Sequence, residues 1–411
     1  MVTAEKSAEE LAKERLARFE TAINLGVPDR VPLWGLGGDI IAAYAGITQH
    51  DMYYNPEKAA MAIEKFARDF PCDYFPGVLL GLGGYVYSVA LSGYDDLAMV
   101  GLIDGPMHDI IGEKFNKFPG REVGENATPQ FLGGTFMYPE EYDELIEDPI
   151  NFIAEKVVPR TSDNLSTPRK AMATWIKVGM ELQRKAQQKG PDIDGALRKL
   201  GYPVEPMGMA CAPLDIIGDF LRGVDQVMLD IYRYPDKVKK AAEIFLEMIV
   251  KGAVDSIKMG CKYVMIPLHL NEYLSPKLYN EFYWPTLKEV ILEICKAGGK
   301  PMVFFEGQHE QHLETLLELP TGWGVACFEK TDVVKAKEVL KDHTCIMGGI
   351  PVSLLISGTP KDIDEYLKNL LEKVKLGGGF ILASGVGSIP VEVPIENVTA
   401  IIEAVEKYGK Y

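Results

Sequence analysis

The chain has 411 residues, of which 47% are hydrophobic and 25% are charged, values typical of a globular protein with a large core. Its formal net charge of −16 argues against nucleic acid or an anionic membrane as a partner, and against a polyanionic substrate. The six cysteines form no CxxC pair, which fits a reducing cytoplasm. No apolar run is long enough to span a membrane and no secretory h-region is visible, so we expect a cytoplasmic protein.

The beginning of the chain predicts helices around a single strand. Ser7, followed three residues later by Glu10, is typical of a helix start. Residues 28–34 (PDRVPLW) predict the first strand, and residues 56–70 have the apolar spacing of a helix. We therefore expect an N-terminal helical extension over about 1–27 that leads into a strand.

The middle of the chain is less regular. Residues 72–135 are rich in Gly, Tyr and Phe and weakly periodic, and they are interpreted as one or two barrel strands plus an insertion. Residues 139–200 are polar with helical spacing and predict a helical insertion. No linker composition is evident, so residues 1–411 are expected to form a single domain.

From residue 203 onward, apolar strands alternate with helices. Such alternation predicts a parallel α/β sheet, and the length of the chain suits one TIM (β/α)8 barrel with insertions. In a parallel barrel, catalytic residues lie where the strands end. The segments with strand character after residue 260 are KYVMIPLHL, KPMVFFEGQHEQH, GVACFEKTD, HTCIMGGI and GGFILASGVG.

Acidic and imidazole side chains follow three of these strands. His269 ends one strand, Glu306 ends the next, and Glu329 ends the third. His309 and His312 are three residues apart, so they share a face of the helix expected after Glu306. Carboxylate and imidazole ligands with one open position are typical of catalytic Zn²⁺. The alternative is that these are ordinary polar residues that cap helices or face water.

Two further clusters are candidates for substrate contacts. Glycines between Trp34 and Asp39 permit a close approach of the backbone to a ligand, although a tight turn with Asp39 capping the next helix is the favoured interpretation. Tyr85, Tyr87 and Tyr94 lie among glycines and suit the wall of a flat apolar pocket. Ordinary core or edge-strand tyrosines explain the second cluster equally well.

Glycines also end the last two strands. Gly348 and Gly349 end one, and Gly385 and Gly387 end the other. Such loops bind phosphate in many proteins, but neither loop contains Lys or Arg. An equal explanation for these glycines is that they leave space beside the backbone for a large flat partner.

Several segments resemble the uroporphyrinogen decarboxylase superfamily. They are residues 28–34 (PDRVPLW), residues 274–290 (LSPKLYNEFYWPTLKEV) and residues 346–405, which begin IMGGIPVSLLISGTPKDIDEYL. The resemblance implies a TIM-type barrel and one of two activities. Some members are decarboxylases, and others are corrinoid-dependent methyltransferases.

The resemblance favours the methyltransferase branch. Decarboxylase members hold a substrate with eight carboxylates, which requires arginines, whereas the loop after the first strand here has no basic residue. Members that methylate coenzyme M bind zinc through a His-x-Cys pair and a later Cys. Aligned on Gly307, these ligands fall at Phe304, Glu306 and Val386. A harder site of Glu and His suits an oxygen substrate better than a thiol.

The chain is therefore similar to the methyltransferase components of O-demethylases, which act on methoxylated aromatics. The resemblance implies zinc, a partner protein that carries the corrinoid, and an anaerobic host, and it is compatible with a homodimer. A methylcobamide:coenzyme M methyltransferase and a uroporphyrinogen-type decarboxylase are the alternatives, and a non-enzymatic binding module is a weaker one. The residues expected in the site are Glu306 and His309 for catalysis; Glu306, His309, His269 and Glu329 for the metal; and Trp34, Asp39, Tyr85, Tyr87 and Phe304 for the substrate.

Overall fold

The computed structural model describes residues 6–411, except for 77–80, 93–101, 189 and 386–387. Tyr94, Val386 and Gly387, which were singled out in the sequence, lie outside the described residues. None of the described helices is both long enough and apolar enough to cross a membrane.

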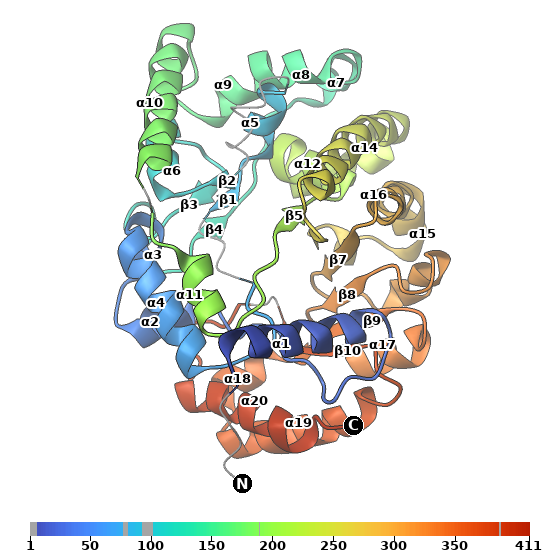
Figure 1. Ribbon diagram of the computed structural model, residues 1–411. Coiled ribbons are helices and arrows are strands. Elements are labelled where there is room, and N and C mark those ends of the chain that lie inside the picture. Colours follow the sequence, from blue (N-terminus) through green and yellow to red (C-terminus); the bar gives the residue numbers. More distant parts are fainter. Residues whose placement is uncertain (1–5, 77–80, 93–101, 189, 386–387) are drawn as a thin grey trace.

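A sheet of six parallel strands forms the centre of the fold (Figure 1). Its strands are hydrogen-bonded in chain order, so each strand pairs with the next one in the sequence. The strands predicted after residue 260 are confirmed. The six are β5 (Met207–Met209), β6 (Tyr263–Leu268), β7 (Lys300–Phe305), β8 (Val325–Phe328), β9 (Cys345–Ile350) and β10 (Phe380–Ser384).

Two N-terminal segments extend this sheet beyond β10. Leu33 makes a parallel bridge to Leu382, and Trp34 makes a parallel bridge to Tyr74. The amide of Trp34 donates to the carbonyl of Leu382 at 2.9 Å. Eight parallel segments thus follow one another in the order of a TIM-type barrel. In the described part of the chain, no ladder joins Tyr74 to β5, so hydrogen bonding does not close the ring.

The inward side chains of the strands form one apolar cluster, separate from the core beneath the outer helices. Helix α1 (Ala8–Ile23) contributes Phe19 to this cluster and lies across one end of the sheet in Figure 1. The predicted pair of Ser7 and Glu10 forms a capping box at its start. Because α1 fills one end of the barrel, the other end is left for a site. The strand and loop members of the cluster are Trp34, Tyr74, Tyr263, Met302, Phe304, Val325, Cys327, Cys345, Met347, Ile381 and Ala383.

Helices cover the outside of the sheet, as the alternating pattern predicts (Figure 1). Most connect consecutive strands, and short 3₁₀ or π segments continue several of them. They are α2 (Ile40–Ala45), α3 (Gln49–Tyr54), α4 (Pro56–Asp69), α12 (Pro213–Ile216), α13 (Val224–Arg233), α14 (Pro235–Lys258), α15 (Pro276–Leu278), α16 (Trp284–Lys296), α17 (Val333–Leu340), α18 (Val352–Ser357), α19 (Pro360–Val374) and α20 (Ile395–Tyr408).

The segment between the second sheet segment and β5 forms a mostly helical lobe, seen at the upper left of Figure 1. It also holds two small antiparallel pairs, β1 (Leu82–Gly83) with β2 (Leu102–Ile103) and β3 (Asn116–Lys117) with β4 (Gln130–Phe131). Among the described residues of this segment, only those near Tyr74 therefore join the barrel. The helices are α5 (Tyr85–Ala90), α6 (Gly105–Ile111), α7 (Tyr142–Glu147), α8 (Pro149–Phe152), α9 (Val158–Thr161), α10 (Pro168–Gln187) and α11 (Ile193–Lys199).

Candidate active site

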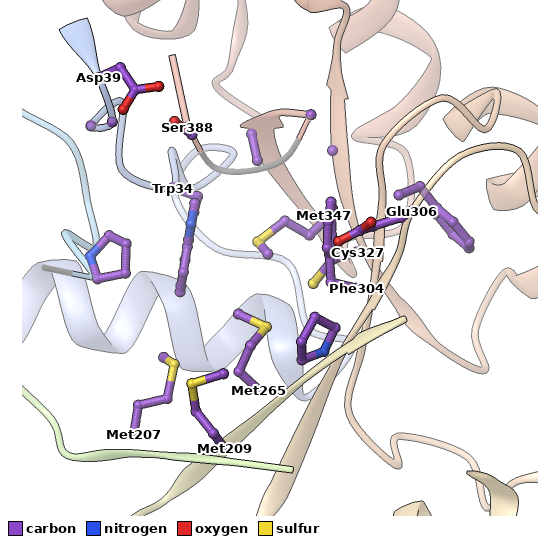
Figure 2. Close-up of a pocket in the computed structure, with 18 of the residues that line it drawn as sticks. Trp34, Asp39, Met207, Met209, Met265, Phe304, Glu306, Cys327, Met347 and Ser388 are labelled. Carbon is purple, nitrogen blue, oxygen red and sulfur yellow. The ribbon is translucent and has the colours of Figure 1, made fainter. Parts of the chain in front are cut away.

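A cavity of about 550 Å³ opens at the carboxyl ends of the strands (Figure 2). This is the end of a parallel barrel where catalytic sites lie, and it is opposite the end that α1 fills. The lining residues are Trp34, Gly37, Gly38, Asp39, Gln49, Met52, Tyr53, Pro76, Met207, Met209, Met265, Pro267, Phe304, Glu306, Cys327, Phe328, Met347, Gly348, Ala383, Gly385 and Ser388. Four of the residues predicted to form the site, Trp34, Asp39, Phe304 and Glu306, line it.

Sulfur atoms and aromatic rings make up much of the cavity wall. Met207 and Met209 are two residues apart on β5, so both point to the same side of the strand. Met265 is paired with Met209 in the neighbouring strand, and Met347 is paired with Cys327. These side chains surround the space between Trp34 and Glu306 in Figure 2. Among the described lining residues there is no Lys, Arg or His, so the wall is apolar and polarizable without being cationic.

Asp39 is the carboxyl on one side of the cavity. It precedes α2 but makes no side-chain capping bond, so the favoured interpretation of Asp39 as a helix cap is wrong. Its Oδ2 accepts a hydrogen bond from the Thr128 hydroxyl at 2.7 Å. Burial raises the pKa of Asp39. The residue is therefore a partly desolvated acceptor that faces the ligand space.

Glu306 is the carboxyl on the other side. It follows the last residue of β7, so its side chain projects from a strand end into the mouth (Figure 2). Burial raises the pKa of Glu306, and nearby Glu329 adds to this, while the charge of His269 opposes it. His269 Nε2 lies 3.7 Å from Glu306 Oε1. A carboxyl with a raised pKa at a cavity wall is suited to donate or accept a proton.

A buried acidic pair holds His269 in place. Asp219 Oδ2 is 2.6 Å from His269 Nδ1. Burial alone would lower the pKa of His269, but the bond to Asp219 and the charge of Asp215 outweigh it and raise the pKa to about 10. Asp215 accepts from the amide of His269 at 3.0 Å and from the hydroxyl of Tyr283 at 2.7 Å. His269 is therefore protonated at neutral pH, and its Nε2 is directed toward Glu306.

Asp215 and Asp219 were not selected from the sequence. They stand four residues apart in the otherwise apolar stretch PLDIIGDF, and this buried acidic pair was the available signal. Both are nearly inaccessible to solvent. Burial, together with the charge of Asp219, raises the pKa of Asp215.

His309 and His312 do not reach the cavity. Gly307 has φ of +67°, and this turn directs the chain away from the mouth into a 3₁₀ helix at Glu310–Glu318. Both imidazoles are buried, and the His312 ring stacks on Tyr279 at 4.0 Å. Burial lowers the pKa of each ring. This placement corrects the expectation that His309 acts beside Glu306 in catalysis.

The residues predicted to bind a metal are therefore divided between two places. Glu306, His269 and Glu329 lie near the mouth, whereas His309 lies behind the strand. Glu329 accepts the amide of Gly307 at 2.7 Å, which directs one of its oxygens to the backbone. In the described part of the chain, no three His, Cys, Asp or Glu side chains are grouped to hold a metal. The described side chains thus do not fit the zinc site that the resemblance implies.

The two described tyrosines of the third cluster lie outside the cavity. The Tyr87 ring is fully buried, and its hydroxyl shares a 2.8 Å hydrogen bond with Thr161. Tyr85 packs against Phe220 and Phe245. Neither lines the cavity. The expectation that they bind substrate is thus corrected, because α5 directs Tyr87 into the helical lobe and Tyr85 against α14 and the segment after α12.

Glycines allow the chain to approach the cavity closely at two points. Gly38 has φ of +131°, and a Cβ atom there would lie 2.4 Å from Ser388 Oγ. Gly348 has φ of +138°, and a Cβ atom would lie 2.6 Å from the Phe328 carbonyl oxygen. Both positions require glycine for conformation and for space.

The model of the family described as uroporphyrinogen decarboxylase (URO-D) matches residues 149–408, more than half of the chain. The chain belongs to the uroporphyrinogen decarboxylase family. A uroporphyrinogen decarboxylase of Coxiella burnetii is 25% identical over 220 residues, covering 53% of this chain and 60% of that protein. The methylcobamide:CoM methyltransferase MtaA of Methanosarcina barkeri is 25% identical over 224 residues, covering 51% of this chain and 60% of that protein.

The alignments to these curated members of the family span about 60% of their length. A solved structure of a methyltransferase from Methanosarcina mazei aligns over 98% of this chain and 99% of its own, with a TM-score of 0.60 and 17% identity. At that identity the likeness concerns the fold. The family and the fold are thus shown, and members on both the decarboxylase and the methyltransferase side are similar to this chain.

Proposed function

We propose that this family member transfers the methyl group of an aryl methyl ether to the Co(I) corrinoid of a partner protein. The observation that carries the proposal is the cavity itself. It combines a wall of methionines and aromatic rings with Glu306, a carboxyl of raised pKa, and its described lining contains no basic residue. An apolar ring fits such a wall, and a departing phenolate needs a nearby proton donor.

The cavity argues against a uroporphyrinogen-type decarboxylase. A substrate with eight carboxylates needs cationic or multiple hydrogen-bond partners once it is removed from water. The described lining offers instead two carboxyl groups, Asp39 and Glu306. Such a ligand would find no cationic partner among the described lining residues.

Transfer to a thiol, the activity in the name of the relative MtaA, is the second alternative. Activation of a thiol requires a metal or another means of stabilising thiolate. Phe304 is an apolar wall residue here, and Glu306 is paired with a protonated imidazole rather than with sulfur ligands. Cys327 lines the cavity, but burial raises its pKa well above the ordinary value, so it remains a neutral thiol.

In the proposed reaction the ether lies between Trp34 and Glu306, with its methyl group directed to the open mouth. The Co(I) of the methyl acceptor attacks the methyl carbon in line and supplies the electron pair of the new Co–C bond. The C–O bond breaks, and its electron pair stays on the phenolate oxygen. Phenol has a pKa near 10, so transfer of a proton from Glu306 to that oxygen is favourable.

The roles of the surrounding residues follow from their contacts. Glu306 is the proposed catalytic residue, because it lines the cavity. His269 is a positioning residue that keeps a cation 3.7 Å from Glu306, and water at the open mouth returns a proton to Glu306 after the phenol leaves. Asp219 keeps His269 protonated through the 2.6 Å contact. The methionines and Trp34 exclude water and hold the ring.

The test is a methyl-transfer assay with a reduced corrinoid protein and a panel of methoxylated aromatics. Conversion of Co(I) to methyl-Co(III) is followed in the visible spectrum. We expect turnover with an aryl methyl ether and a large loss in Glu306→Gln, while exposed Glu365→Gln retains full activity. If no ether methylates Co(I) but methyl-corrinoid loses its methyl group to an added thiol, the proposal is refuted in favour of the thiol reaction.

A further inference from the structure

We infer that the cavity selects an uncharged methoxyarene that carries a ring hydroxyl, and that it rejects methoxyarenes bearing a carboxylate. This inference rests on the proposed function and deepens it by naming the substrate class. It begins with the two carboxyl groups of the cavity, which enter from different elements. Asp39 comes from the loop before α2, and Glu306 comes from the end of β7. In Figure 2 they stand on opposite sides of the ligand space.

A ligand between them meets acidic groups in both directions. Asp219 and Glu329 lie close enough to Glu306 to act on its pKa, so the negative charge extends behind that wall. The cation beside Glu306, His269, is hydrogen-bonded to Asp219 at 2.6 Å and does not line the cavity. A carboxylate on the ligand would therefore enter the cavity without a cationic partner, which is costly in a desolvated site.

Two lysines line the neighbouring cavity. Lys330 and Lys373 line a second cavity of about 670 Å³, which shares Gly385 with the first. That second cavity also contains Glu329 and Asp332. Neither lysine lines the first cavity, so a ring held between Trp34 and Glu306 does not contact them there.

Asp39 is equipped to accept a hydrogen bond from a neutral ligand. Thr128 donates to its Oδ2, and no described group donates to its Oδ1. Beside it, the Trp34 ring is fixed by stacking on Tyr74, with ring centroids 5.0 Å apart and planes 2° from parallel. Trp34 thus offers a flat, rigid wall for an aromatic ring. A hydroxyl at the far edge of that ring donates to Oδ1 while the ether oxygen lies toward Glu306.

The decisive comparison uses ligands that differ only in this substituent. Binding of 3-methoxyphenol, methoxybenzene and 3-methoxybenzoate to the full chain is measured by titration calorimetry at pH 7.5, without any corrinoid protein. We expect 3-methoxyphenol to bind best and 3-methoxybenzoate to bind at least about tenfold more weakly, the effect expected for one unfavourable charge contact at low effective dielectric. The same order is expected for kcat/KM in methyl transfer.

Asp39→Asn tests the origin of the preference. The variant removes the charge and keeps the shape, so the discrimination between 3-methoxyphenol and 3-methoxybenzoate should fall about tenfold. Glu365→Gln, an exposed change of the same charge on α19, should leave the discrimination unchanged. Far-ultraviolet circular dichroism and thermal unfolding verify that both variants fold.

The outcomes separate the two proposals. If 3-methoxybenzoate binds and donates its methyl group as well as 3-methoxyphenol, the substrate class is overturned while the proposed function holds. Loss of that benzoate binding in Lys330→Met would locate the carboxylate in the neighbouring cavity. If no ether donates a methyl group, the proposed function fails, and the inference then fails with it, whatever the binding order.

Discussion

Replacing Asp219 by Asn should remove the proton from His269 at neutral pH. Burial lowers the pKa of His269, but the hydrogen bond to Asp219 and the surrounding negative charges outweigh it and raise the pKa from 6.5 to about 10. That difference corresponds to about 5 kcal/mol at about 1.4 kcal/mol per pKa unit. Because a third of the His269 side chain is exposed, solvent screening reduces the expected contribution to about 2 kcal/mol.

The sign of the pH dependence follows from the direction of the change. A raised pKa in the folded state stabilises the protein fully below about pH 6.5, and this stabilisation is lost as the pH rises through about 10. Wild-type protein should therefore lose about 2 kcal/mol more stability between pH 7 and pH 10 than Asp219→Asn. Asp215 and Glu306, which also face His269, remain in the variant.

The assay is urea unfolding at several pH values, together with NMR titration of the His269 ring in protein labelled at histidine. Exposed Asp225→Asn serves as the control, and its pH dependence should match that of the wild type. A His269 midpoint near 6.5 in the wild type would refute the reasoning, since the imidazole would then be neutral beside Glu306. An Asp219→Asn variant with an unchanged midpoint would show that Asp219 does not hold the proton there.

Three other predictions concern the cavity and its surroundings. Glu306→Gln should lower kcat for methyl transfer about 100-fold or more with little change in the Kd of the ether, as measured by rapid-mixing spectroscopy and calorimetry. Tyr87→Phe should lower the free energy of unfolding by about 1 kcal/mol, because the buried hydrogen bond to Thr161 is lost. The KM for the ether should stay unchanged, and a raised KM would show that Tyr87 contacts the substrate. Gly348→Ala should cost about 2 kcal/mol or more, seen as a lower thermal midpoint, because φ is +138° and the new methyl group meets a carbonyl oxygen.

Much of the barrel was predictable because its strands are buried on both faces and read as short apolar runs. The residue that ends such a strand is then placed at the mouth, which is how Glu306 was found. His309, only three residues later, was not predictable in the same way. Its direction depends on the left-handed turn at Gly307, and the sequence does not specify whether the chain after a glycine continues along the rim or turns behind the strand.

The methionine wall and the acidic pair were missed for a different reason. Met207 and Met209 show the alternation of a strand face, but Met265 and Met347 join them only through the pairing of separate strands. Asp219 reaches His269 across fifty residues of sequence. A single sequence identifies such residues one at a time, and their function depends on neighbours that are set by the three-dimensional pairing.

The proposed chemistry depends on an apolar cavity wall that is combined with one proton donor, Glu306. In transfer to a thiol, a metal with soft ligands can stabilise the sulfur anion before the attack. An ether carries no anion before the reaction and releases a phenolate afterwards. The negative charge that must be stabilised is therefore on the leaving oxygen and not on the attacking atom. A carboxyl of raised pKa at position 306, kept beside the imidazolium of His269, meets that later need. In the proposed reaction, Glu306 at this strand end would serve the leaving group, and the apolar wall would keep its carboxyl poorly solvated.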